Sequence, residues 1–195
     1  MQKYGDNKNK HMKAVAEVMY ENAKALNLNP EIAYVIGLLH DVGYIAIDKD
    51  TPKEEKISHA QEGARILEEI GITGDNLDAV RYHGVNGYKM IEDGKTSRIS
   101  PMLMLLQYGD MSVDKYGEKV GFAKRIMDIG KRYGMDSIAY KNAIETVNFL
   151  NEVLELRLEG NKPYINPMNA EQFFDKVLDI ESRLMEKRHE EEIER

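Results

Sequence analysis

The chain of 195 residues contains no cysteine and no tryptophan, and it contains only five prolines. Without cysteine the protein has no disulfide bond, no iron–sulfur cluster and no zinc site built from thiolates. Any metal ion must therefore be held by histidine, aspartate or glutamate. The same absence is typical of proteins from a reducing compartment, and we expect a cytoplasmic location.

Basic residues are outnumbered, and long apolar runs are missing. The 27 lysines and arginines against 34 aspartates and glutamates give a net charge of −7, which argues against a broad surface for nucleic acid or anionic lipid. The longest apolar stretch lies within residues 32–39, far below the roughly 20 residues that cross a bilayer. The lysine-rich N-terminus precedes no apolar segment of the kind found in export signals. We expect neither a membrane nor an extended nucleic acid as partner.

Helical periodicity dominates what is present. From Met12 to Leu26 the apolar residues recur at steps of three or four, and prolines stand only at the starts of such segments or between them. We expect an all-α domain over residues 1–195, with residues 137–195 forming additional C-terminal helices packed on the rest. The expected helices cover residues 12–26, 30–39, 75–83, 102–111, 118–133, 137–159 and 170–187, with one more opening at a Ser58 capping box. Residues 84–97 are expected to be a mobile or hairpin-like loop, 160–169 a turn-rich connector and 189–195 a frayed tail.

Six polar side chains are predicted to point inward from five helical segments: His11, His40, Asp41, His59, His83 and Asp110. A buried polar group without a partner costs about 1–3 kcal/mol, so a group of them requires a cation or a dense hydrogen-bond network. Successive residues of a helix point about 100° apart, so His40 and Asp41 reach one ion only where their helix ends, and Gly43 is expected to end it. Any one of the six alone would more often be a hydrogen-bonded core residue. Together they predict a divalent metal site.

The order His, His-Asp, His, His, Asp resembles that of the HD-domain superfamily of metal-dependent phosphohydrolases. The fragments GLLHDVGY, SHAQEG, RYHG and LQYGDMS look like its successive motifs, and the resemblance covers residues 8–130. It implies an HD-type helical bundle in which one metal is held by His11, His40, Asp41 and Asp110. Asp41 would bridge to a second metal bound by His59 and His83, with His40 and Asp41 as the catalytic pair. The branch most similar contains small bacterial proteins that resemble symmetrical diadenosine tetraphosphate hydrolases.

The resemblance implies hydrolysis of a phosphate ester or anhydride in a small, nucleotide-like substrate. One or two ions of Fe, Mn, Co, Ni or Zn suit the ligands, and two ions about 3.5–4 Å apart can hold a hydroxide that attacks the phosphoryl group. Related enzymes often carry Gly-Lys after the HD pair, with the lysine on substrate phosphate, where this chain has Gly43-Tyr44. The candidate phosphate-binding cations are then Arg81, Lys89, Arg98, Lys115 and Arg125, although each would more often be a solvated surface charge.

Other functions are compatible with the same ligands. Some HD proteins with six such residues are di-iron oxygenases, and a non-catalytic domain that binds a nucleotide or a protein partner is a third alternative. Four tyrosines near the ligands are candidates to stack on a base, or else to lie in the core: Tyr44, Tyr82, Tyr88 and Tyr108. A homodimer formed through residues 137–195 is a further expectation.

Overall fold

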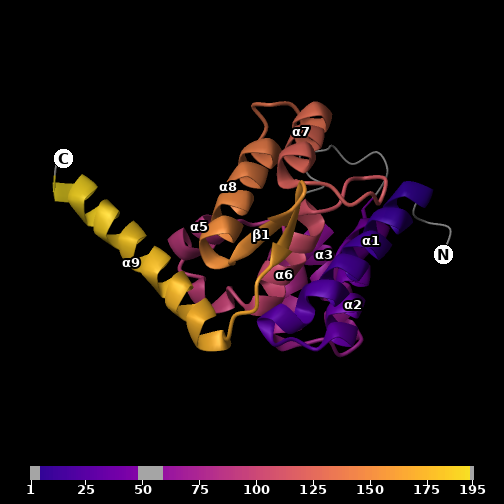
Figure 1. The fold of residues 1–195 in the computed structure, drawn as a ribbon, viewed down its shortest axis with the longest axis horizontal. Helices are drawn as coiled ribbons and strands as arrows, with labels where there is room; N and C mark the ends of the chain where they lie inside the picture. Colours follow the sequence, from indigo (N-terminus) through magenta and orange to yellow (C-terminus); the bar gives the residue numbers. More distant parts are fainter. Residues whose placement is uncertain (1–4, 48–58, 194–195) are drawn as a thin grey trace.

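Helices account for most of the computed structural model, which describes residues 5–47 and 59–193 (Figure 1). The α-helices are α1 (Asp6–Asn22), α2 (Pro30–Leu39), α3 (His59–Glu69), α4 (Gly74–Tyr82), α5 (Gly87–Glu92), α6 (Pro101–Met111), α7 (Phe122–Tyr133), α8 (Ile138–Val153) and α9 (Ala170–Ile193). Short 3-10 turns are η1 (Ala23–Leu26), η2 (Val42–Ile45) and η4 (Thr96–Arg98). The prediction of an all-α fold with additional C-terminal helices is confirmed.

Helix α6 forms the centre of the core. Of its residues only Pro101 and Asp110 are not buried, and α1, α2, α4, α7 and α8 all pack against it. Ser100 caps its start by accepting a hydrogen bond from the backbone N–H of Leu103 at 3.2 Å, as the Ser-Pro signal predicts. Asp110 is thus carried by a helix that is buried on nearly all sides, with its carboxylate at the edge of the core.

Two predictions about local structure are wrong. The expected helix over residues 137–159 ends at Val153, and β1 (Leu156–Glu159) then pairs antiparallel with β2 (Lys162–Ile165). Gly160 adopts a left-handed φ of +64° in the two-residue turn, which is a hairpin signal that helical periodicity obscured. Tertiary contacts fix the hairpin, because Ile165 is buried and Tyr108 donates a hydrogen bond to the carbonyl of Pro163 at 2.6 Å.

The expected loop at residues 84–97 instead contains helix α5. Asn86 caps α5 by accepting a hydrogen bond from the backbone N–H of Lys89 at 2.9 Å. A Cβ at Gly87 would stand 2.1 Å from the ring of Phe149, so glycine lets α5 approach α8 closely. Side-chain capping and this contact outweigh the low helix propensity of the segment.

Helix α9 contacts the core as far as Leu184 and pairs with α8 through Arg183, and its end beyond these residues projects from the rest of the described chain (Figure 1). It stays helical to Ile193, so the predicted fraying from residue 189 onward is wrong for the described residues. The expected Ser58 cap of α3 lies outside the described residues. Within residues 5–47 and 59–193 no helix combines the length and apolar character that crossing a bilayer requires.

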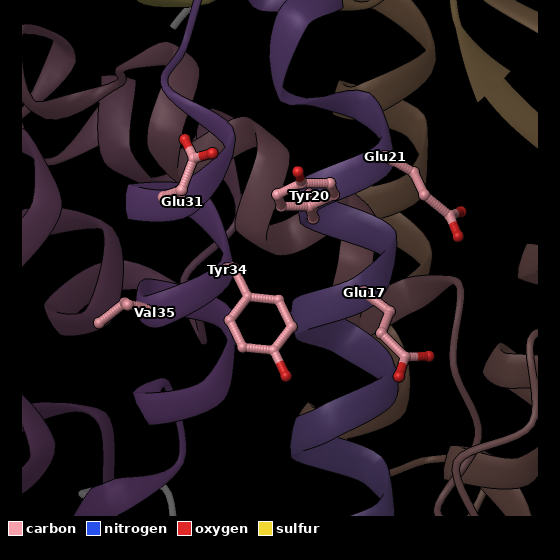
Figure 2. A pocket seen from close by; sticks show the side chains of 6 residues that line it. All are labelled: Glu17, Tyr20, Glu21, Glu31, Tyr34 and Val35. Carbon is pink, nitrogen blue, oxygen red and sulfur yellow. The ribbon is translucent and has the colours of Figure 1, made fainter.

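A recess of about 410 Å³ lies between α1 and α2, on a face lined by none of the predicted ligands (Figure 2). Tyr20 and Tyr34 meet edge to face there with ring centroids 6.4 Å apart. Its lining residues are Glu17, Tyr20, Glu21, Glu31, Tyr34 and Val35. The recess is therefore separate from the cluster described next.

Candidate metal centre

The six predicted ligands converge on one place inside the bundle. They come from α1, the end of α2, the start of α3, the end of α4 and α6: His11, His40, Asp41, His59, His83 and Asp110. The Nε2 atom of His11 lies 3.0 Å from Oδ1 of Asp110, and the Nε2 atoms of His59 and His83 lie 3.1 Å apart. Among the described residues, two groups of three have all their ligand atoms within 4.8 Å of one another. The first group is His11, His40 and Asp110, and the second is His40, Asp41 and His83.

The carboxylate of Asp41 lies between the two halves of the cluster. Its Oδ2 faces His40 Nε2 at 3.5 Å, whereas its Oδ1 faces His59 Nε2 at 3.2 Å and His83 Nε2 at 3.8 Å. The two oxygens of one carboxylate therefore point at different histidines. Asp41 groups with His40 and His83, and it is not in the group of mutually close donors that contains His11 and Asp110. His40 is the residue common to both groups.

Three histidines are oriented by backbone carbonyl groups. The Nδ1 atom of His40 lies 2.7 Å from the carbonyl oxygen of Gly37, that of His83 2.7 Å from Val80, and that of His11 2.9 Å from Asp114. A carbonyl oxygen only accepts hydrogen bonds, so each Nδ1 must carry the proton. In the neutral ring the lone pair is then on Nε2, the atom that faces the cluster, as in metal-binding histidines.

The cluster has the donors that a divalent ion needs. His40 Nε2 is fully buried and has no hydrogen-bond partner. The Nε2 atom of His11 lies 3.0 Å from a carboxylate oxygen of Asp110, so both atoms are placed to bind one ion. Ligands bound to one ion at about 2.0–2.2 Å lie roughly 3 Å from each other, close to the separations seen here. The donor set therefore fits a hard or borderline divalent ion, such as that of Mn, Fe, Co, Ni or Zn.

Burial and neighbouring charge prepare the HD pair for a cation. Burial lowers the pKa of His40 to about 4, so its imidazole is neutral at pH 7. Burial alone would raise the pKa of Asp41, but attraction to His40 and Lys8 holds that pKa well below its usual range. A neutral imidazole and an ionised carboxylate are the forms that bind metal.

The remaining buried pairs differ in how they are stabilised. Burial opposes the charged form of His83, yet its interaction with Asp41 raises the pKa of this imidazole. Burial likewise disfavours ionised Asp110, but the Arg125 guanidinium holds the pKa of that carboxyl well below its usual range. A proton therefore competes with metal at His83 more than at an ordinary histidine, whereas Asp110 is ionised at neutral pH.

The end of α2 explains how two successive residues serve one centre. The helix stops at Leu39, and Asp41 has φ −98° and ψ 12°, so the chain leaves helical geometry between the two ligands. Gly43 does not end the helix as predicted, since it lies in η2 without a left-handed φ. A Cβ there would stand 1.9 Å from the carbonyl oxygen of His59, so glycine instead allows η2 to touch α3.

Replacing Gly43 with alanine is expected to displace the start of α3. Overpacking of this kind costs about 1–3 kcal/mol of folding free energy and moves His59 away from Asp41. Thermal unfolding should show the loss of stability, and titration with Mn²⁺ should show weaker binding at the His59 side. Gly84→Ala is the matched control, because a Cβ at Gly84 meets nothing within 4 Å. Equal stability of the two variants would contradict the packing argument.

Four predicted phosphate-binding cations have partners outside the cluster. Arg81 pairs with Glu68 and Asp78, and Arg98 with Asp78. Lys89 pairs with Glu92 and Asp93, and Lys115 lies over the ring of Tyr116. The fifth, Arg125, is buried and holds a ligand instead, with Nη2 donating to Asp110 Oδ1 at 2.7 Å and Nε donating to the Asp110 carbonyl at 3.1 Å.

An Arg125→Met variant is expected to be less stable by about 3 kcal/mol without metal. This is the low end of the range for a broken buried ion pair, because the Asp110 side chain is 26% exposed. A bound cation would neutralise the Asp110 carboxylate in place of Arg125. Added Mn²⁺ should therefore reduce the difference in unfolding free energy between wild type and Arg125→Met, measured by chemical denaturation. Arg65→Met, which removes two exposed pairs, should change stability far less than Arg125→Met does. If Mn²⁺ leaves the loss of stability in Arg125→Met unchanged, Arg125 does not act through Asp110 as a metal ligand.

Two residues at the cluster were missed by the sequence analysis. Lys8 donates a hydrogen bond to Asp41 Oδ2 at 2.6 Å, and its Nζ lies 3.6 Å from the ring centroid of Tyr44. Gln107 of α6 donates to the carbonyl of His83 at 3.2 Å and to that of Val85 at 2.7 Å, which fixes the turn that carries His83. Spacing could have placed Lys8 one helical turn before His11, but only the packing of α1 on α2 brings it to Asp41.

The four tyrosines have different environments. Tyr44 stacks on His59, with ring centroids 4.3 Å apart and an interplanar angle of 15°. Tyr108 is buried in the core, and Tyr82 packs against the edge of that core. Tyr88 donates a hydrogen bond to Glu152. Of the four, Tyr44 is the one whose ring contacts a predicted ligand.

Comparison with known families agrees with this arrangement. Residues 10–112, more than half of the chain, match the family model of the HD domain, and the match contains all six predicted ligands. A search of curated proteins finds no significant match. The HD family binds divalent metal ions and consists mostly of metal-dependent phosphohydrolases. The chain belongs to the HD-domain family.

Proposed function

We propose that this protein is a dinuclear metal-dependent phosphohydrolase that cleaves a phosphate ester or anhydride of a nucleotide-like substrate. The observation that carries the proposal is the convergence of His and Asp donors around the buried, unpartnered Nε2 of His40. A core histidine with a structural role would have both ring nitrogens hydrogen-bonded, because an unsatisfied buried polar atom is destabilising.

Each ligand has a role in this proposal. One ion would be held by His11, His40, Asp41 and Asp110, and the other by Asp41, His59 and His83. When bound, the ions would supply an activated water and neutralise charge on the phosphoryl group. The water oxygen forms a new bond to phosphorus while the bond to the leaving oxygen breaks, and the water proton ends on the leaving group or in solvent.

The supporting residues of the chain act by holding this geometry. The carbonyls of Gly37, Val80 and Asp114 fix the rings of three histidines, and Arg125 fixes Asp110. Preorganised charge of this kind lowers the barrier because no reorganisation is needed in the transition state. No serine or cysteine nucleophile is required.

The test is a panel of substrates offered to protein reconstituted with each candidate metal. Mononucleotides, dinucleoside polyphosphates and sugar phosphates should be compared with Mn, Fe, Co, Ni and Zn. Released phosphate is measured for the monoesters, and nucleotide products are measured by chromatography for the dinucleoside polyphosphates, whose hydrolysis at an internal anhydride releases no free phosphate. The proposal expects metal-dependent hydrolysis that proceeds equally with and without oxygen. The dinucleoside polyphosphates test the closer resemblance to diadenosine tetraphosphate hydrolases.

Two other results would each replace the proposal. Oxygen consumption that needs iron, with no phosphate release, would favour a di-iron oxygenase. Tight nucleotide binding without turnover under any metal would favour a non-catalytic domain.

A further inference from the structure

Lys8 is the one described lysine whose ammonium contacts a predicted metal ligand. It lies in the first turn of α1, three residues before His11, and donates to Asp41 Oδ2 at 2.6 Å. Asp41 Oδ2 also faces His40 Nε2 at 3.5 Å. The ammonium therefore occupies the side of Asp41 on which the first metal would bind.

The Lys8 ammonium is held in place by its neighbours, and Asp41 accepts only one of its hydrogen bonds. One face lies over the Tyr44 ring at 3.6 Å from its centroid, a cation–π contact that also positions the lysine. An ammonium has three donors, and Asp41 takes one of them. The Lys8 side chain is 29% exposed, so the group reaches solvent at the edge of the cluster.

Two other cations near the cluster, Arg132 and Arg125, are already paired. Arg132, which lies close enough to act electrostatically on Tyr44, pairs with Asp128 at 3.0 Å. Arg125 is buried, and its guanidinium donates twice to Asp110 and pairs with Asp128. The phosphate-binding cations predicted from the sequence are paired with partners elsewhere. Lys8 is thus the positive charge best placed to meet an anion that approaches the metals.

We propose that Lys8 binds substrate phosphate: it pairs with Asp41 in the metal-free protein and contacts the phosphate once Asp41 binds metal. This role rests on the proposed function, because it presumes that a phosphoryl group is brought to the metals. Two cations compete for Asp41, so loading the site with metal weakens the pair and directs the ammonium outward. The lysine remains beside Tyr44, with its side chain partly exposed to solvent.

The proposal predicts effects of opposite sign on two ligands, measured by calorimetry. In Lys8→Met, Mn²⁺ should bind about three- to tenfold more tightly, since a competing positive charge is gone. Inorganic phosphate should bind the Mn²⁺-loaded variant about 10- to 100-fold more weakly, the range for a lost charge-assisted hydrogen bond. Lys8→Arg should restore phosphate binding to within a few-fold of wild type.

The control is Lys13→Met, on the same helix, which removes an exposed lysine paired with Glu17 and should change neither affinity. Phosphate binding that is equal in wild type and Lys8→Met would overturn the role of Lys8 while leaving hydrolysis intact. A loss of phosphate binding in Lys8→Met, in a protein that hydrolyses nothing, would uphold Lys8 and overturn the proposed function. A loaded wild type that binds no phosphate would overturn both.

Discussion

An Asp41→Ala variant is expected to lose bound metal and phosphohydrolase activity together. Both oxygens of Asp41 face histidines, one on each side of the cluster, so no other residue replaces the bridge. Loss of such a charged group should lower turnover by about 10³-fold or more. With Mn²⁺ at about 100 times its dissociation constant, wild type should unfold about 5–10 °C higher than without it, and the variant should show no such shift.

Controls separate this effect from general damage to the fold. Asp41→Asn keeps the shape of the side chain but removes its charge, and it should also lose metal. Asp78→Asn changes another buried acid, which lies on α4 and pairs with Arg98, and this variant should retain metal. Circular dichroism verifies that each variant is folded. Normal turnover in folded Asp41→Ala would end the proposed function.

A His59→Ala variant is expected to lose one of two metals and to keep the other. His59 Nε2 lies 3.1 Å from His83 and 3.2 Å from Asp41, whereas His11 and Asp110 pair on the other side. The metal-to-chain ratio should therefore fall from two to one. Phosphate release should fall about 10²- to 10³-fold, because one ion no longer stabilises charge in the transition state.

The chain offers a matched control for this change. His189 lies on the exposed end of α9, so His189→Ala should keep both metals and full activity. Asp110→Asn should lose the ion on the opposite side, which assigns the two sites independently. Retention of two metals by His59→Ala would show that His59 is not a ligand.

Much of the cluster could be predicted because its ligands follow local rules. Asn29 and Ser100 each cap a helix that begins with proline, and both caps are made in the structure. Those caps set where α2 and α6 begin, and the spacing of the buried residues along each helix then directs His40 into the core and Asp110 to its edge. The turn after α2 then lets Asp41 point the same way as His40.

The rest depends on contacts between distant segments. Lys8 and Asp41 are 33 residues apart, and their pair exists only because α1 packs against α2. Arg125 looked like a surface cation, but α7 buries it beside Asp110. Gly43 looked like a helix stop, although its function is to let the chain touch the carbonyl of His59. Composition and periodicity contain no information about these long-range contacts.

The central claim is that six side chains on five segments hold two metal ions. Elemental analysis of protein purified without chelator and then saturated with Mn²⁺ tests it most directly. We predict two ions per chain for wild type and fewer than one for Asp41→Ala. A folded wild-type protein that binds no transition metal at millimolar concentration would contradict the account.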